Sequence, residues 1–170
     1  KMNLLIVREN TEGFYSDRNM FAGPGEFMPT ENIALSFRKI SREGSLRVAR
    51  QAFKIAMERK QRVTVVHKAN VLKVSDGLFL SCVEEVGREF PNVKLDEELV
   101  DAMAAHLIRT PERFDVILTT NMYGDILSDE AAELSGGLGL GGSINAGEKY
   151  AVAQAAHGAA PDLMGKNIAN

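Results

Sequence analysis

Two aspartates, Asp125 and Asp129, are four residues apart in a segment whose apolar spacing indicates the first turns of a helix. At that spacing, both carboxylates project from the same helix face. Mg²⁺ prefers hard oxygen ligands and typically takes one or two carboxylates together with substrate and water. The pair therefore indicates a divalent-ion site, although acidic residues near a helix N-terminus also serve simply to complement the helix dipole. The spacing alone leaves both interpretations open.

Two other ionisable residues lie where catalytic groups are often found, at the ends of regular elements. Lys68 follows an apolar segment that ends at His67, and Tyr15 lies in a loop after an apolar run near the start of the chain. Taken singly, a residue of either type at such a position is more often an ordinary surface residue. The three histidines do not show metal-ligand spacing, and we expect His67 and His106 to be structural.

Composition limits the class of protein. The chain has 170 residues, of which 45% are hydrophobic and 25% charged, as expected for a globular domain with a real core. We expect no membrane span and no signal peptide. The single cysteine, Cys82, cannot form an internal disulfide, which fits a reducing compartment, so a cytoplasmic location is expected. A net charge of −3 predicts neither nucleic acid nor membrane as a partner.

The apolar residues alternate between strand and helix spacing, which predicts an α/β fold with a sheet covered by helices. Ser75 or Asp76 is expected to cap the second helix. The expected strands are residues 4–7, 62–67, 93–95 and 115–120, and the expected helices are residues 46–57, 75–90, 99–108 and one that starts near Gly124.

Residues 13–40 lack a helical stripe and contain a turn-rich centre between apolar segments. Such a segment can leave the body as a two-stranded arm, and exposed strand edges favour pairing with another chain. Residues 38–62 are locally basic, with nine Lys or Arg against two Glu. A helix of this kind usually presents a solvated outer face, and the alternative is a module that binds an acidic partner.

The glycine run at residues 137–142 matches the G-x-G-x-x-G dinucleotide fingerprint, and Asp162 lies twenty residues beyond it. That fingerprint works only where a strand leads through a tight turn into a helix. Here the glycines follow a helix that includes Ile126, Leu127 and Leu134. We therefore interpret the run as a helix exit, where glycine is favoured, and reject a Rossmann domain in this segment.

Four segments together resemble the isocitrate/isopropylmalate dehydrogenase family of β-decarboxylating dehydrogenases: residues 7–15, 67–73, 121–129 and 157–162, in the family's order and at about its spacing. The resemblance implies the fold of that family, with residues 1–135 as a small α/β domain, residues 13–41 as a dimerisation arm, and residues 136–170 as the start of the return into the large cofactor-binding domain. It also implies that flanking segments of the family are absent, so we expect this fragment alone to be inactive.

The resemblance further implies roles for individual residues in the oxidative decarboxylation of a malate-type 2-hydroxy acid. Arg8 would hold a substrate carboxylate, which suits its planar guanidinium. Asn70 would lie near the nicotinamide and substrate. Lys68 would take the hydroxyl proton, and Tyr15 would return a proton to C3. Asp125 and Asp129, with Asp101 of the partner subunit, would bind Mg²⁺ or Mn²⁺, which polarises the forming carbonyl. The implied assembly is a homodimer with exchanged arms and shared active sites.

The nucleotide would contact the loop formed by His157, Gly158, Ala160, Pro161 and Asp162. Family members that use NAD carry an acidic residue in this loop, so Asp162 indicates NAD, because a carboxylate accepts hydrogen bonds from ribose hydroxyls and repels a 2′-phosphate. Residues 10–13 resemble isocitrate, homoisocitrate or tartrate enzymes more than isopropylmalate enzymes. A non-catalytic regulatory subunit of the same family is the alternative, but Tyr15, Lys68 and the three aspartates are all present.

Overall fold

The computed structural model describes residues 2–15 and 20–168, and these form two compact units, Lys1–Leu127 and Ser128–Asn170. The elements are β1 (Leu5–Arg8), β2 (Glu26–Thr30), β3 (Ile33–Ser36), α1 (Arg42–Met57), β4 (Arg62–His67), α2 (Ser75–Glu89), β5 (Lys94–Leu99), α3 (Val100–Arg109), η2 (Pro111–Arg113), β6 (Val116–Thr119), α4 (Asn121–Ser135), η3 (Leu138–Leu140), β7 (Gly142–Ala146), β8 (Ala151–Ala155) and η4 (Pro161–Leu163). The predicted domain boundary after residue 135 stays a prediction.

The first unit is built on a four-stranded sheet with the order β1-β6-β4-β5, and all its neighbouring strands are parallel. The two central strands, β4 and β6, are buried and mostly β-branched or apolar, as expected for a parallel sheet covered on both faces. The predicted α/β alternation is therefore confirmed. Helix α1 begins after Ser41, whose side chain accepts a hydrogen bond from the amide of Gly44.

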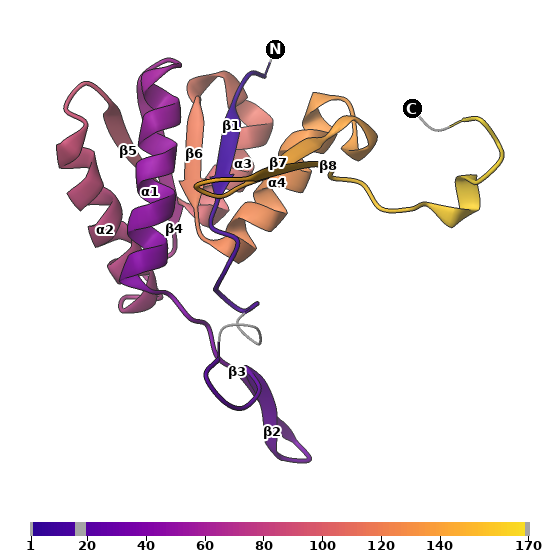
Figure 1. Ribbon diagram of the computed structural model, residues 1–170, viewed down its shortest axis with the longest axis horizontal. Helices are drawn as coiled ribbons and strands as arrows, with labels where there is room; N and C mark the ends of the chain where they lie inside the picture. Colours follow the sequence, from indigo (N-terminus) through magenta and orange to yellow (C-terminus); the bar gives the residue numbers. More distant parts are fainter. Residues whose placement is uncertain (1, 16–19, 169–170) are drawn as a thin grey trace. The chain divides into compact units, whose positions relative to one another are not determined.

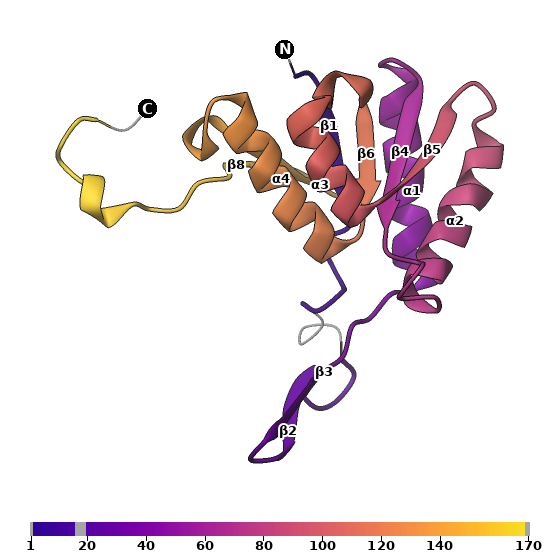
Figure 2. The same cartoon turned by 180° about the vertical axis from the view of Figure 1, so that it is seen from behind.

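Helices cover both faces of this sheet, as the two opposite views show (Figure 1, Figure 2). On one face, α1 and α2 pack against the strands through a core that includes Phe53 and Phe79. On the other face, α3 and the start of α4 bury Met103, Leu107 and Leu127 in a second cluster. Fixing helices on both faces holds the strand ends in register, and those ends carry the candidate site residues.

Two local predictions for the first unit are wrong. Strand β5 has six residues, twice as many as the expected strand at residues 93–95. The extension contains the acidic residues Asp96, Glu97 and Glu98, which pair with neighbouring side chains. Asp96 pairs with Arg62 and Lys94, an arrangement that hydropathy does not reveal. Helix α2 has Val74 at its N-cap without a side-chain cap, so neither Ser75 nor Asp76 caps it.

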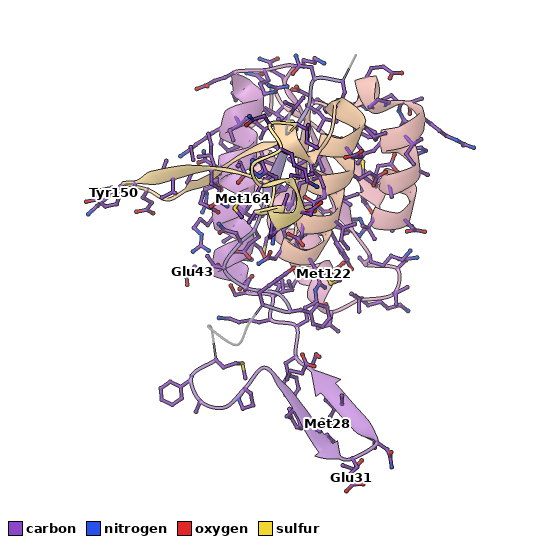
Figure 3. The ribbon with its side chains drawn as sticks, turned by 90° about the vertical axis from the view of Figure 1, so that its right-hand side faces the viewer. Met28, Glu31, Glu43, Met122, Tyr150 and Met164 are labelled. Carbon is purple, nitrogen blue, oxygen red and sulfur yellow. The ribbon has the colours of Figure 1, made fainter. Side chains whose placement is uncertain are left out.

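Strands β2 and β3 pair antiparallel as a hairpin, which confirms the predicted two-stranded arm. Every residue of both strands is exposed, including Met28 of β2, and Glu31 lies in the turn between the strands (Figure 3). Phe27 and Phe37 contact each other with ring centroids 5.5 Å apart. The base of the arm is closed by a backbone bridge between Gly13 and Lys39. Residues 16–19 of the arm segment lie outside the described residues.

In the second unit, the glycine run ends α4. The amide of Gly137 donates to the carbonyl of Ala132 at 3.1 Å, and the amide of Gly136 donates to that of Glu133 at 3.3 Å, which is the Schellman pattern. Both glycines have positive φ, at 140° and 113°, a conformation that disfavours side chains. The interpretation as a helix exit is confirmed.

Beyond the glycine run, β7 and β8 form an antiparallel hairpin that the sequence reasoning missed. Its strands are rich in Gly, Ala and Ser and lack the alternation of apolar and polar residues that predicts a strand. All residues of the two strands are exposed, and Tyr150 lies at the turn between them (Figure 3). None of the helices in the described part of the chain combines the length and apolarity needed to cross a membrane.

Candidate functional site

The carboxyl ends of the four parallel strands form one edge of the first unit's sheet, and three of the predicted site residues, Arg8, Lys68 and Asp101, lie at or just after these strand ends. In the strand register, Arg8 at the end of β1 is beside Thr119 of β6, and His67 at the end of β4 is beside Leu99 of β5. Lys68 comes one residue after β4, and Asp101 lies in the first turn of α3 directly after β5. In open α/β sheets, ligands bind at this edge.

Arg8, Tyr15 and Asp125 form the first cluster. The guanidinium of Arg8 forms an ion pair with the carboxylate of Asp125, and its Nε donates to Oδ1 of Asn121 at 2.8 Å. The hydroxyl of Tyr15 donates to the other carboxylate oxygen of Asp125 at 3.2 Å. The guanidinium carbon also lies 5.7 Å from the centre of the Tyr15 ring, within cation–π range. A cation, a phenol and a carboxylate thus meet at the β1 and β6 ends.

Gly124 makes this cluster sterically feasible. A Cβ at that position would lie 2.6 Å from Cγ of Arg8 and 2.8 Å from its Cβ. The arginine side chain therefore crosses the first turn of α4 in space that only glycine leaves open. Glycine inside a helix is otherwise unfavourable, so its presence early in α4 was a readable signal of a close approach.

Lys68 and Asp101 form the second cluster, at the β4 and β5 ends. The ammonium of Lys68 donates a hydrogen bond to Oδ1 of Asp101. That hydrogen bond lowers the pKa of the Asp101 carboxyl below its ordinary value of 3.8. Asn70 lies exposed in the turn that follows Lys68.

His67 is structural in this turn, as expected. Its ring is buried, its Nδ1 accepts a hydrogen bond from the amide of Ala69 at 2.9 Å, and its Nε2 lies 2.9 Å from Glu97. Because Nδ1 is an acceptor, Nε2 carries the proton and donates to the carboxylate. His106 stacks on Phe114 with ring centroids 6.4 Å apart, and its Nδ1 lies 3.2 Å from Oε1 of Glu98.

The metal site was predicted to combine Asp125, Asp129 and the partner's Asp101. Asp125 and Asp129 both lie on α4, and their carboxylates are hard oxygen donors of the kind that Mg²⁺ and Mn²⁺ take. Within the described residues of this one chain, no three His, Cys, Asp or Glu side chains come close enough to hold an ion. Asp125 and Asp129 therefore supply two of the ligands that a divalent ion needs, and the contribution of Asp101 from a partner subunit stays a prediction.

The predicted nucleotide loop lies in the second unit. Four of its residues line a surface hollow, namely His157, Gly158, Ala160 and Pro161, and Asp162 is not among the lining residues. Ala160 has φ 42° and ψ 63°, a left-handed conformation that is rare for a residue before proline. Backbone strain of this kind is concentrated at functional sites.

Charge pairs on the surface bear on the basic helix. The guanidinium groups of Arg42 and Arg50 on α1 form ion pairs with Glu85 and Glu89 of α2, at 2.6 and 2.9 Å. The hydrogen bond between Arg50 and Glu89 raises the pKa of the arginine and lowers the pKa of the glutamate. Positive charges that are already paired within the chain do not favour a module for acidic partners.

Sequence reasoning missed several residues that hold the candidate site residues Arg8 and Lys68 in place through hydrogen bonds and ion pairs. Asn121 holds the guanidinium of Arg8, while its side-chain amide donates to the carbonyl of Glu12 at 2.9 Å. Arg38 and Asp76 form a buried ion pair next to Lys68. The available signal for Asp76 was a charged residue within a segment predicted as a helix with an apolar stripe. A charged side chain that is buried in such a place is rarely unpaired.

Comparison with known proteins agrees with this architecture. Residues 1–170 match the isocitrate/isopropylmalate dehydrogenase family. The chain is 46% identical over 170 residues to a homoisocitrate dehydrogenase of Methanocaldococcus jannaschii, covering 99% of this chain and 46% of that protein. It is 43% identical to an NADP isocitrate dehydrogenase of Rickettsia typhi, covering 99% of this chain and 34% of that protein.

A solved structure gives the same result for the fold. The crystal structure of an isocitrate dehydrogenase from Methylococcus capsulatus superposes with a TM-score of 0.90 at 44% identity, covering all of this chain and 50% of that one. The chain thus spans at most about half the length of these relatives. A family match over every residue, a shared fold and identities above 40% lead to one conclusion: the chain belongs to the isocitrate/isopropylmalate dehydrogenase family.

Proposed function

We propose that the protein, in the complete form that its relatives have, catalyses the NAD-dependent oxidative decarboxylation of a malate-type 2-hydroxy acid of the isocitrate, homoisocitrate, tartrate or 3-isopropylmalate class. The observation that carries this proposal is the sheet edge, where one cluster offers a guanidinium, a phenol and a carboxylate and another offers an amine and a carboxylate. The alternative of a regulatory subunit is not favoured, because none of the expected reactive residues has been replaced.

Arg8 is proposed to bind a carboxylate of the substrate. Its guanidinium already pairs with the carboxylate of Asp125, which is the same chemical group that the substrate presents. The Arg8 side chain donates a hydrogen bond to Asn121 and packs against Gly124, where a Cβ would overlap it. The orientation of its guanidinium is therefore fixed before the substrate binds. Such preorganisation lowers the entropic cost of orienting the substrate.

Asp125 and Asp129, together with a carboxylate from a second copy, would hold Mg²⁺ or Mn²⁺. The bound ion supplies Lewis-acid polarisation of the C2 oxygen and charge stabilisation after CO₂ loss. The Arg8 guanidinium forms an ion pair with the carboxylate of Asp125 and so orients it.

Lys68 and Tyr15 are proposed to move the two protons of the reaction. The amine of Lys68, in its neutral form, would accept the proton of the C2 hydroxyl as hydride leaves for the nicotinamide. The phenol of Tyr15 would donate its proton to C3 after decarboxylation. Asp101 accepts a hydrogen bond from Lys68 and so orients that amine.

The second copy is proposed to pair through the arm. The hairpin and the residues next to it expose several large apolar side chains: Met20, Phe21, Phe27, Met28, Ile33, Leu35 and Phe37. Exposed apolar surface of this extent marks an interaction site, and a hairpin with free edges suits exchange between two identical chains. The two clusters of the sheet edge would then combine across the dimer.

The direct test is an absorbance assay of the complete enzyme. NAD or NADP reduction is followed with Mg²⁺ against isocitrate, homoisocitrate, 3-isopropylmalate, tartrate and malate. We expect turnover with NAD and one class of these acids, and none from the 170-residue chain alone. An Asp162→Lys variant should weaken the preference for NAD over NADP, because it removes the repulsion of a 2′-phosphate. Absence of turnover with every acid and both nucleotides would contradict the proposal.

Shared sites have their own test. Tyr15→Phe and Lys68→Met enzymes, each of low activity, are mixed and allowed to exchange subunits. If a site takes Tyr15 from one copy and Lys68 from the other, each mixed dimer regains one intact site, so roughly a quarter of the wild-type activity returns on random exchange. Two Lys68→Met preparations mixed with each other are the control. No recovery despite demonstrated exchange would show that both residues act within one chain.

A further inference from the structure

Both backbone polar groups of Lys68 are held in place, which fixes the start of its side chain. Its amide donates to Oδ2 of Asp76 at 2.6 Å. Its carbonyl accepts from the amides of Val71 and Leu72 at 2.9 and 2.8 Å. The amide bond to Asp76 is charge-assisted, and such bonds are roughly twice as strong as neutral ones.

Asp76 is a fully buried carboxylate, and Arg38 is the cation that balances it. The side chains of Arg38 and Asp76 are 8% and 0% exposed and form an ion pair. Arg38 also donates to the hydroxyls of Thr120 and Ser75, at 3.0 and 3.3 Å, and lies over the ring of Tyr123, 5.2 Å from its centre. The guanidinium thus joins α2, the β6–α4 connection and, through Asp76, the turn after β4.

Arg38 is placed by the arm. It lies two residues after β3 and next to Lys39, whose backbone pairs in both directions with Gly13 at 2.8 and 3.0 Å. Gly13 is two residues before Tyr15. The backbone bridge at the arm base therefore holds the segment that carries Tyr15 on one side and the residue that supports Lys68 on the other.

We propose that Arg38 and Asp76 are positioning residues for Lys68, and that they couple the base of the arm to the turn carrying this lysine. This inference rests on the role proposed above for Lys68. The proposal predicts that a change at the arm base or in the Arg38–Asp76 pair loosens the turn that carries Lys68. Strand β4, which precedes this turn, should stay intact.

The test is amide hydrogen exchange by NMR in the 170-residue chain, with Arg38→Met and Asp76→Asn. We expect exchange at the Lys68 amide to accelerate roughly ten- to a hundred-fold, as for loss of a hydrogen bond to a charged group. The amide of Val65 within β4 serves as the reference for global unfolding, and in both variants Lys68 should exchange through a local opening that is faster than exchange at Val65. After reductive methylation, the ¹³C signal of the Lys68 amine should also shift. Arg50→Met, which breaks the exposed pair with Glu89, is the matched control and should change neither readout.

Thr120→Val serves if Arg38→Met does not fold, since it removes a single acceptor of the guanidinium. It should accelerate exchange at Lys68 in the same direction by a smaller factor. Arg38→Lys, which keeps the charge but not the fork, should restore part of the protection. The proposal is overturned if the Lys68 amide keeps its wild-type rate, or if it exchanges only through global unfolding, no faster than Val65 in the same variant. Because no substrate or nucleotide is present, this outcome is independent of whether the complete enzyme turns over.

In the complete enzyme, Asp76→Asn should lower kcat more than it raises KM, because substrate binding by Arg8 is untouched. The reverse pattern, a raised KM with unchanged kcat, would also overturn the proposal.

Discussion

The two clusters of the sheet edge hold their reactive groups by different means. Lys68 stands on a buried scaffold, in which Asp76 is fully enclosed and bonded to the lysine backbone. Tyr15 comes from the arm segment, is 47% exposed, and reaches Asp125 by a hydrogen bond at 3.2 Å. The lysine side therefore depends on the core of one chain, whereas the tyrosine side depends on the arm, whose exposed apolar surface we propose to be covered by a second copy.

The largest expected effect breaks the lysine side directly. Lys68→Met in the complete enzyme should lower kcat by about 10²- to 10⁴-fold, the usual contribution of a general acid or base. The measurement is initial rate against substrate concentration. Lys54→Met on α1 is the control and should retain wild-type kcat. A kcat for Lys68→Met within twofold of wild type would remove Lys68 from the proposed proton transfer.

The second prediction contrasts the stability of the two sides. Arg38→Met leaves Asp76 buried without its cation, so the free energy of unfolding should fall by about 3–5 kcal/mol. Asp125→Asn disrupts the partly exposed pair with Arg8, where the loss should be about 0–1 kcal/mol. Urea denaturation measures both. Equal losses for the two variants would mean that the lysine side has no special scaffold.

The third prediction concerns glycines in two helices. Gly124→Ala should destabilise by about 1–3 kcal/mol, because the new methyl group overlaps the side chain of Arg8. Gly77→Ala in α2 is the matched control, since its Cβ would meet nothing within 4 Å. That change should stabilise by about 0.5–1 kcal/mol through helix propensity. Stabilisation by both variants would show that the side chain of Arg8 does not need the space left by the missing Cβ of Gly124.

The smallest effect is a titration. The hydrogen bond from Lys68 lowers the pKa of Asp101, so its carboxyl should titrate below 3.8 in ¹³C NMR. A lowered folded-state pKa contributes stability above pH 3.8 that is lost as the pH falls through the folded-state value. Lys68→Met should return the titration toward 3.8. An unchanged midpoint in that variant would mean that the Lys68–Asp101 contact does not form in solution.

Much of the fold could be predicted because local periodicity reflects burial. The strand leading to Lys68 and the helix expected at residues 46–57 follow from apolar spacing, and the structure confirms both. Strand β5 was underestimated because its acidic residues are satisfied by cross-strand and helix partners, which periodicity cannot see. The β7–β8 hairpin was missed because its small residues carry almost no apolar signal.

The candidate site divides in the same way. Asp125 and Asp129 could be found by spacing within one helix, and Lys68 by its position at a strand end. Arg38 could not be linked to Lys68 from sequence, because the two residues belong to different elements and meet only through Asp76. Gly124 was expected near the start of the fourth helix, and its role became clear only from the path of the Arg8 side chain.

The sequence by itself determined the alternation of strands and helices, the helix-ending role of Gly136 and Gly137, and the motifs that mark the family, because each depends on neighbours within a few residues. Only the tertiary structure decided which charges meet. Arg8 lies more than a hundred residues from Asp125, and Arg38 nearly forty from Asp76. Such pairs are selected by the register of parallel strands and by the cost of burying an unpaired charge, and neither quantity exists until the sheet has formed.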